Sequence, residues 1–203
     1  MICLGRPTNE RLRRFLELQR PCGFTYAAVG ATAATPPNGF VVDRTRIHLG
    51  YGAPAFESAK DGLRRWEQFQ LGWVEAWPST ASLRTGEVVA VICRIGGISW
   101  VNACRIVYVI DDAGPAVRFG FAYGTLPQHI EAGEEQFQVV WERTTDAVSY
   151  EILAFSRPRQ VLSRLAYPLL RRLQKRFGRD SALAMFRAVN GADGNPIVHQ
   201  STG

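Results

Sequence analysis

The chain lacks a long hydrophobic run. Its most apolar stretch, Val88 to Cys93, ends at Arg94 and is far shorter than the roughly 20 residues that a membrane-spanning helix needs. The N-terminal residues, Met1 to Pro7, lack the apolar core and the cleavage pattern of a signal peptide. We therefore expect a soluble, cytoplasmic protein.

Cysteine and histidine are also scarce. The 203 residues include four cysteines and three histidines. No Cys-x-x-Cys pair occurs, and no histidine neighbours a cysteine at zinc-ligand spacing. Gly-x-x-x-x-Gly-Lys, Gly-x-Gly-x-x-Gly and a Ser-His-Asp order are absent too, which argues against nucleotide-binding and serine-hydrolase sites. We predict reduced thiols, no cofactor and no metal site.

The composition of the chain indicates one globular domain. Hydrophobic residues make up 46% of the chain and charged residues 21%, which is enough apolar material for a core and too little charge for a disordered chain. The net charge is +6. A basic balance by itself favours solubility as much as contact with nucleic acid or an anionic membrane.

Nearly all of the positive excess lies in one C-terminal segment. Residues 157–187 contain nine Lys or Arg and one acid, Asp180, a net +8 that leaves −2 for the rest of the chain. Apolar residues recur there at helical spacing, which predicts an amphipathic helix over residues 160–189 with a break or start at Tyr167-Pro168: Leu162, Leu165, Leu169, Leu173, Phe177 and Ala184.

The basic face of this helix has two interpretations. Five basic residues fall within one arc of the helical wheel, so we expect them to reach solvent together: Arg164, Arg171, Arg172, Lys175 and Arg179. They either solvate a helix whose other side is buried or contact an anionic membrane surface. We do not expect nucleic acid as a partner, because the aromatic residues lie mostly on predicted strands, away from these bases.

In the rest of the chain, the pattern predicts a short helix, one strand, a second helix and then a long run of strands. Thr8 is placed to cap a short helix that Pro21 ends. A strand over 40–49 and a helix over 54–69 follow. Six more strands are predicted at 73–77, 86–95, 100–110, 117–125, 135–143 and 148–155. Their short connections predict antiparallel hairpins.

A meandering antiparallel sheet needs a cover for one face, and the last helix is the long apolar element left to provide it. The pattern therefore predicts an α+β, helix-grip fold: an antiparallel sheet of six or seven strands wrapped around a long C-terminal helix, with a cavity between them. We expect a single helix-grip domain over 1–190 with a small N-terminal helical extension. Residues 191–203 carry no apolar period and are predicted to be a disordered tail.

Several stretches resemble a family of domains of unknown function. Among them are Phe24-Thr25-Tyr26, Val29-Gly30-Ala31-Thr32, Arg105-Ile106-Val107-Tyr108, Phe119 to Pro127, Gly133-Glu134-Glu135 and Ala154 to Pro158. That family is similar to the START-like, helix-grip (SRPBCC) superfamily. The resemblance implies the fold, and it implies binding of hydrophobic ligands, as in most of that superfamily. It brings no catalytic residues, and fold alone does not establish function.

The strand over 117–125 is the clearest candidate for a ligand wall. Phe119, Phe121 and Tyr123 share one face, and three small residues share the other: Gly120, Ala122 and Gly124. A row of small residues lets another group approach the backbone closely. That group is either a ligand or the packed C-terminal helix.

A polar cluster follows this strand. His129, Glu131, Glu134 and Glu135 could bind a metal, act as acid and base or solvate a loop, and their spacing matches no known metal site. Three further polar residues are candidates for the same cavity: Arg105 and Tyr108, which lie in an otherwise apolar strand, and Asp180, inside the apolar arc of the last helix. Asp180 either meets Arg176 one turn away or points into the cavity.

The leading functional hypothesis is the binding of a hydrophobic or amphipathic small molecule between the sheet and the C-terminal helix. Its candidate ligand-binding residues are Arg105, Tyr108, Phe119, Phe121, Tyr123, His129 and Asp180. The alternative is an enzyme, a hydrolase or lyase, that uses His129 or Glu134 with Arg105 in the same cavity. A further alternative is peripheral contact with a membrane or with nucleic acid through the basic helix.

Overall fold

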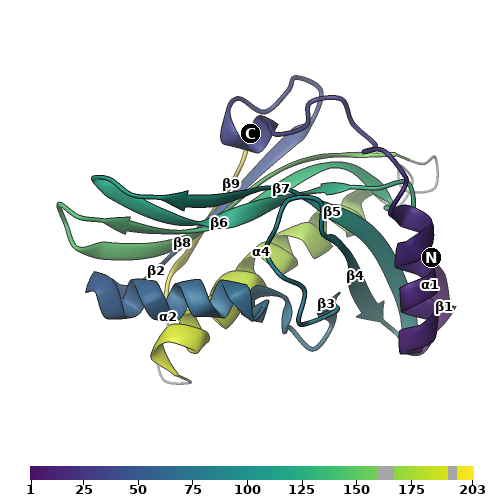
Figure 1. Cartoon of the computed structure of the whole chain (residues 1–203), viewed down its shortest axis with the longest axis horizontal. Coiled ribbons are helices and arrows are strands. Elements are labelled where there is room, and N and C mark those ends of the chain that lie inside the picture. Colours follow the sequence, from purple (N-terminus) through teal and green to yellow (C-terminus); the bar gives the residue numbers. More distant parts are fainter. Residues whose placement is uncertain (160–166, 192–195) are drawn as a thin grey trace.

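A single antiparallel sheet dominates the computed structural model, which describes residues 1–159, 167–191 and 196–203 (Figure 1). Its strand order is β3-β4-β5-β6-β7-β8-β2-β9, and β1 pairs with β5 outside this path. The strands are β1 (Ile2–Leu4), β2 (Val41–Tyr51), β3 (Val74–Trp77), β4 (Val88–Ile95), β5 (Ile98–Asp112), β6 (Ala116–Thr125), β7 (Glu131–Glu142), β8 (Ala147–Pro158) and β9 (Val198–Thr202).

Helices cover both faces of the sheet. The short helix α1 (Asn9–Gln19) begins at Thr8, whose hydroxyl accepts a hydrogen bond from the Arg11 amide and so caps the helix. The helices α2 (Gly52–Arg64) and α4 (Tyr167–Asn190) lie together on the inner face of the sheet. Short 3-10 turns complete the set: η1 (Ala31–Ala33) and η2 (Glu67–Phe69). Among the described residues, no helix is long and apolar enough to cross a membrane.

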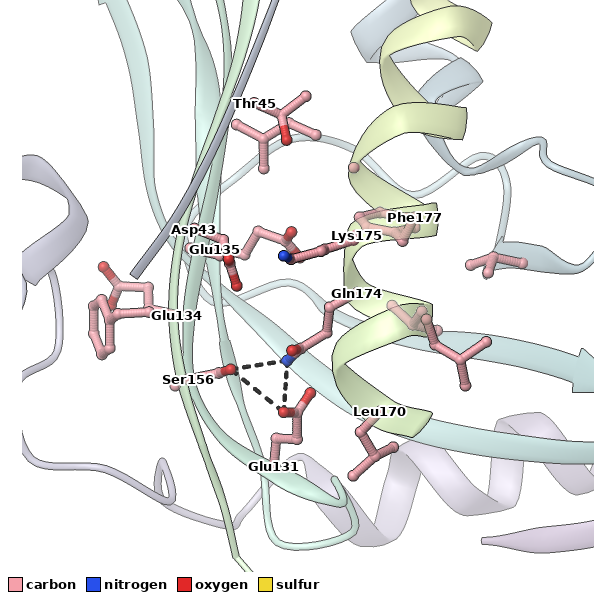
Figure 2. A pocket seen from close by; sticks show the side chains of 18 of the residues that line it. Asp43, Thr45, Glu131, Glu134, Glu135, Ser156, Leu170, Gln174, Lys175 and Phe177 are labelled. Carbon is pink, nitrogen blue, oxygen red and sulfur yellow. Dashed lines mark hydrogen bonds between the residues drawn. The ribbon is translucent and has the colours of Figure 1, made fainter. Parts of the chain in front are cut away.

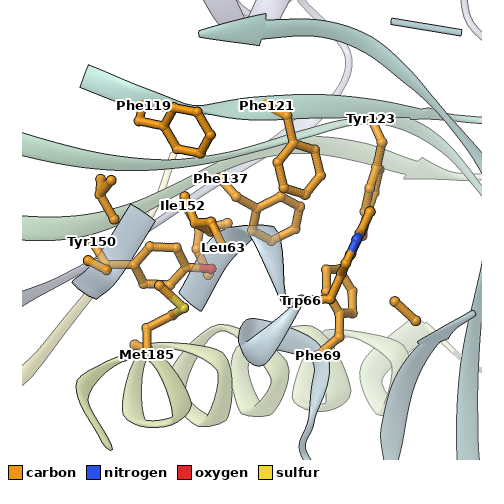
Figure 3. Close-up of a cluster of buried hydrophobic side chains, with 14 of the residues drawn as sticks. Leu63, Trp66, Phe69, Phe119, Phe121, Tyr123, Phe137, Tyr150, Ile152 and Met185 are labelled. Atoms are coloured by element: carbon orange, nitrogen blue, oxygen red, sulfur yellow. The ribbon is translucent and has the colours of Figure 1, made fainter. Parts of the chain in front are cut away.

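The main core lies between the inner face and the pair α2 and α4 (Figure 3). Phe121 and Phe137 on neighbouring strands pack with Trp66 and Phe69, with ring centroids 5.0 to 5.6 Å apart, and Met185 of α4 is fully buried beneath them. A second core lies on the outer face, where α1 places Leu12, Phe15 and Leu16 against β4 and β5. Period-2 alternation along the strands supplies both cores.

The predicted α+β helix-grip architecture is confirmed. The sheet is antiparallel throughout, and α4 lies against its inner face, where the Cβ of an alanine at Gly178 would come within 2.6 Å of Thr45 Oγ1. Such close packing requires a glycine on the helix. The described part of this helix starts at Tyr167, next to Pro168; residues 160–166, which the prediction also included, lie outside the described residues.

Two strands were missed. The sheet has nine strands and not six or seven, because β1 and β9 add to it. The prediction of a disordered tail is therefore wrong for Val198–Thr202, which pairs with β2. The backbone of β9 pairs with β2, which would otherwise be the edge strand of the sheet. The Gln200 side chain donates to Thr45 Oγ1 and to the Lys175 carbonyl (3.3 and 2.9 Å). Both partners are tertiary, so the tail composition does not reveal them.

The small-residue face of β6 does not receive the C-terminal helix. It is the outer face, and the loop of residues 24–34 lies on part of it. A Cβ at Gly124 would lie 2.1 Å from Tyr26 Oη, and one at Gly120 would lie 2.1 Å from the Phe137 carbonyl of the next strand. These two glycines therefore admit the aromatic loop and the neighbouring backbone, which corrects the alternative of a packed C-terminal helix.

Candidate functional site

A pocket of about 420 Å³ lies between the inner face of the sheet and the N-terminal half of α4 (Figure 2). This volume is within the range of roughly 300–1,000 Å³ that is typical of small-molecule sites. Its apolar wall comes from η2, β3, β4, β8 and α4: Phe69, Trp73, Val74, Val91, Cys93, Ile152, Leu170, Leu173 and Phe177. Most of its polar groups come from the other edge of the sheet, on β2, β7 and β8. The pocket is therefore amphipathic.

Asp43 of β2 and Arg171 of α4 form an ion pair beside the pocket. Arg171 donates to both carboxylate oxygens of Asp43, at 2.5 and 2.6 Å, and the Thr202 hydroxyl donates to the same carboxylate at 2.9 Å. The two charged side chains are 15% and 24% exposed, which favours a bidentate pair of this kind over a solvated one. The pair holds the start of α4 against β2 and β9.

Glu131 is held by neutral donors. Gln174 of α4 donates to its Oε1 at 2.6 Å, and the Ser156 hydroxyl donates to the same oxygen at 3.3 Å (Figure 2). Burial raises the pKa of this carboxyl, and the hydrogen bonds oppose the rise. The carboxyl thus sits in a position where its charge is costly.

Glu135 is the second carboxyl on this face. It lies opposite Tyr123 in the β6–β7 pairing, and the Tyr123 hydroxyl donates to its Oε2 at 2.7 Å. The pKa of Glu135 is raised to about 7. Burial is the largest cause of the rise, the hydrogen bond from Tyr123 opposes it, and the carboxyls of Glu131 and Asp43 add to it. Near neutral pH this group therefore exchanges a proton readily.

His129 closes the pocket between β6 and β7. Its Nδ1 accepts a hydrogen bond from the Glu131 amide at 3.0 Å, so the neutral ring carries its proton on Nε2. Burial lowers the pKa of His129 to about 4, against the small rise that this hydrogen bond causes. The side chain is a neutral hydrogen-bonding group at physiological pH.

The structure brings two of the seven candidate ligand residues to this pocket, Tyr123 and His129. Two others lie on the outer face. Arg105 donates to the carbonyls of residues 19, 20 and 22 at 3.3, 2.7 and 2.9 Å, where it caps the C-terminus of α1. Tyr108 hydrogen-bonds to Thr32 and Gln136. Placing Arg105 and Tyr108 in the cavity was therefore wrong.

Two more candidates belong to the solid core. Phe121 is fully buried between Trp66 and Phe137. Phe119 lies at the α2 end, where the side chains of Lys60 and Arg64 sit over its ring at 5.1 and 4.8 Å. Neither ring lines the pocket. Alternation predicted their shared face correctly, and α2 fills the space in front of them.

Asp180 supports the pocket wall from behind. It accepts a hydrogen bond from the Trp73 indole at 3.0 Å and pairs with Arg176 and Arg179 at 3.2 and 3.0 Å. The Arg176 guanidinium also lies 4.4 Å from the centre of the Trp73 ring. Asp180 thus meets Arg176 as one interpretation predicted, and its role at the pocket is to orient Trp73.

The hypothesised catalytic set does not converge. Glu134 turns its side chain to the outer face, away from the pocket (Figure 2). There it accepts hydrogen bonds from the Tyr26 hydroxyl (2.6 Å) and the Gly30 amide (2.7 Å), and from both the amide and the hydroxyl of Thr32 (2.9 and 2.5 Å). With Arg105 also outside, His129 has neither proposed partner. Glu134 instead fixes the loop of residues 24–34 to the sheet.

The basic face of α4 is partly neutralised. Arg171 pairs with Asp43, and Arg176 and Arg179 share Asp180, so the predicted arc does not reach solvent as one free patch. Arg172, Lys175 and Arg179 are nevertheless exposed. Arg164, the fifth member of the arc, lies outside the described residues.

Sequence reasoning missed Asp43, Ser156 and Gln174 as pocket residues. A usable signal existed for Asp43, because it is in phase with Thr45, Ile47 and Leu49 on the buried side of its strand. A second signal was the in-phase pair Glu131 and Glu135 on β7. A charged residue in register with a buried face indicates a polar cavity or an ion pair.

Family membership follows from sequence comparison. Residues 25–184 match the family described as a domain of unknown function, DUF1990. The chain belongs to this family. It is also similar to UPF0548 proteins: 33% identical to one from Dictyostelium discoideum, over 93% of this chain and 96% of the relative, and 34% identical to one from Arabidopsis thaliana, over 92% and 96%. A relative from Deinococcus radiodurans is 32% identical over 93% and 99%.

Solved structures show more distant similarity to this DUF1990 protein. A conserved protein from Geobacillus kaustophilus aligns with a TM-score of 0.47 and 10% identity, over 78% of this chain and 99% of that chain. Human STARD10 aligns with a TM-score of 0.39 and 11% identity, over 87% and 80%. The helix-grip description of the DUF1990 chain rests on its own strand order and helix placement.

The resemblance of the sequence stretches to a family of domains of unknown function is confirmed by the family match and the UPF0548 relatives. Several of those stretches meet on the outer face, where Tyr26, Gly30 and Thr32 surround Glu134 and Gly124 admits the Tyr26 ring. Part of the shared pattern therefore builds the loop attachment. Glu135, from the same stretch as Glu134, lines the pocket.

Proposed function

We propose that this protein binds a hydrophobic or amphipathic small molecule in the pocket between the sheet and α4. The observation that carries the proposal is the composition of the pocket wall. One side is formed by Phe69, Trp73 and Phe177 with aliphatic neighbours, and the other carries Glu131 and Glu135. An apolar wall with a few converging polar groups is typical of small-molecule sites.

Packing supports an occupant of this kind. Phe69 lies 5.3 Å from the Phe177 ring and 6.0 Å from the Tyr123 ring, so these aromatic groups form a continuous surface between η2, α4 and β6. Burying apolar ligand surface against it contributes roughly 25 cal/mol per Å². The polar groups at the other edge of the sheet then orient the ligand.

A pocket-filling variant tests the proposal. The full-length protein is titrated with the neutral fluorescent probe N-phenyl-1-naphthylamine, and native mass spectrometry of the purified protein reveals any molecule that accompanies it. We expect saturable binding of the probe. Leu173→Trp places a large ring in the pocket and should weaken binding at least about tenfold, because roughly 1.4 kcal/mol of lost contact corresponds to that factor.

The matched control is Leu169→Trp, one turn earlier on α4. Leu169 is 58% exposed and does not line the pocket, so this variant should bind the probe like the wild type. Circular dichroism and thermal unfolding verify that both variants fold. The proposal is wrong if the probe does not bind saturably, or if both tryptophan variants bind it as tightly as the wild type.

A further inference from the structure

The carboxyls of the pocket differ in their partners. Of its three carboxyls, Asp43 is matched by Arg171. Glu131 and Glu135 receive their hydrogen bonds from neutral groups on Gln174, Ser156 and Tyr123. Within residues 1–159, 167–191 and 196–203, neither of these two carboxyls has a salt bridge to a base.

Glu135 lies at the boundary between the polar and apolar walls. Its hydrogen-bond donor, Tyr123, packs against Phe69, whose ring in turn meets Phe177. In Figure 2 the Glu135 side chain points from the sheet toward α4, with Phe177 on the opposite side. A ligand that lies against the aromatic wall therefore brings one end close to this carboxyl.

A buried carboxylate without a cation is costly. A positively charged ligand group would offset this cost and supply a charge-assisted hydrogen bond. A carboxylate or phosphate on the ligand would instead face Glu131 and Glu135, and like charges repel strongly where water is excluded. Arg44 and Lys175 also line the pocket, but both residues are exposed to solvent, where their charges are screened.

We propose that the ligand of this pocket is an amphipathic amine, with its apolar body against Phe69, Trp73 and Phe177 and its protonated nitrogen next to Glu135. The inference rests on the proposed function and adds the chemical class of the ligand. The raised pKa of Glu135 agrees with it, since a nearby cation would favour the ionised form of the carboxyl.

A matched series of probes tests the head group. Octylammonium, 1-octanol and octanoate share one apolar chain and differ in charge. Each is used at pH 8, where octylamine is protonated, to displace N-phenyl-1-naphthylamine from the full-length wild-type protein. We expect octylammonium to displace the dye at the lowest concentration, octanol at a higher one, and octanoate at the highest.

Glu135→Gln removes the charge and keeps the shape of the side chain. It should weaken octylammonium binding at least about tenfold, as expected for the loss of a hydrogen bond between charged groups, and should leave octanol binding within about twofold. Glu142→Gln makes the same change on the same strand, outside the pocket, and should leave the order of the three probes as it is in the wild type.

The outcomes separate this inference from the proposed function. If the dye binds but octanol or octanoate displaces it as well as octylammonium does, the amine assignment is overturned and the pocket remains a binding site. The amine assignment is also overturned if Glu135→Gln leaves the preference for octylammonium intact. If the dye itself does not bind, the proposed function fails, and the amine assignment fails with it. The wild-type order needs no variant, so the test holds even if Glu135→Gln does not fold.

Discussion

Glu134 and Glu135 are consecutive residues of β7, yet their carboxyl groups lie on opposite faces of the sheet (Figure 2). Glu134 accepts four hydrogen bonds from the loop of residues 24–34. Glu135 accepts one from Tyr123 and faces the pocket. The charge of Glu134 is thus stabilised by four protein donors, whereas the charge of Glu135 is stabilised by one. The same substitution at the two positions should therefore change stability in opposite directions.

Glu134→Gln should destabilise the protein. The charged acceptor of two amides and two hydroxyls is lost, and an amide side chain cannot accept all four bonds. We expect the free energy of unfolding in urea to fall by about 2 kcal/mol or more. Glu142→Gln, at the far end of the same strand, should change it by less than about 0.5 kcal/mol. Equal stabilities for the two variants would show that Glu134 does not hold the loop.

Glu135→Gln should stabilise the ligand-free protein at high pH. The pKa of Glu135 is raised from 4.5 to about 7, so between these values the folded state holds a proton that the unfolded chain has released. This carboxyl therefore lowers wild-type stability as pH rises through that window. The variant lacks the effect, and its advantage in free energy of unfolding should exceed about 1 kcal/mol at pH 8.

The measurement compares urea unfolding of Glu135→Gln and wild type from pH 4 to pH 8. The difference should be small near pH 4 and should grow up to pH 8. If the free energy of unfolding of the two proteins differed by the same amount at every pH, Glu135 would have an ordinary pKa. The other charged or titratable groups around this position are present in both proteins: Asp43, Cys104, Tyr123, Glu131, Tyr150, Arg171 and Lys175.

Gly124→Ala should displace the aromatic loop from the outer face. The added methyl group would lie 2.1 Å from Tyr26 Oη and 2.9 Å from Phe24, so the loop must shift, at a cost of about 1–3 kcal/mol. Hydrogen exchange at the Gly30 and Thr32 amides should accelerate. Gly114→Ala, whose methyl group would have its nearest contact at 4.0 Å, is the control. Unchanged exchange in Gly124→Ala would contradict the proposed packing.

Asp43 and Arg171 should be energetically coupled. A double-mutant cycle with Asp43→Asn and Arg171→Gln should give a coupling free energy of about 1 kcal/mol or more, because the pair is bidentate and largely removed from solvent. If Arg171 were one of several solvated bases on α4, as the helical wheel predicts, the coupling would be close to zero.

Contact of α4 with an anionic membrane stays a proposal that rests on its exposed bases. Each base near an anionic surface contributes about 1 kcal/mol. The double variant Arg172→Glu and Lys175→Glu should therefore sediment less with anionic vesicles at low salt than the wild type, and circular dichroism and thermal unfolding would verify its fold. If the two proteins sediment equally, these bases only keep the exposed face of the helix soluble and do not contact the membrane.

The sequence by itself determined the elements and their class. Alternation along β6 indicated that Phe119, Phe121 and Tyr123 share the buried face, Thr8 indicated where α1 begins, and short hairpin connections indicated an antiparallel sheet. These signals are local, because side-chain periodicity and capping act within a few residues. The order of elements then allowed the helix-grip arrangement to be predicted.

Only the tertiary structure decided which polar residues share a site. Arg105 and Tyr108 lie on the outer face because α1 and the loop of residues 24–34 bring partners to them there. Arg171 and Asp43, 128 residues apart, meet because α4 crosses β2. The last strand, β9, pairs with β2 because that edge of the sheet is open. Each of these contacts joins distant segments, so its energy depends on packing that no local pattern contains.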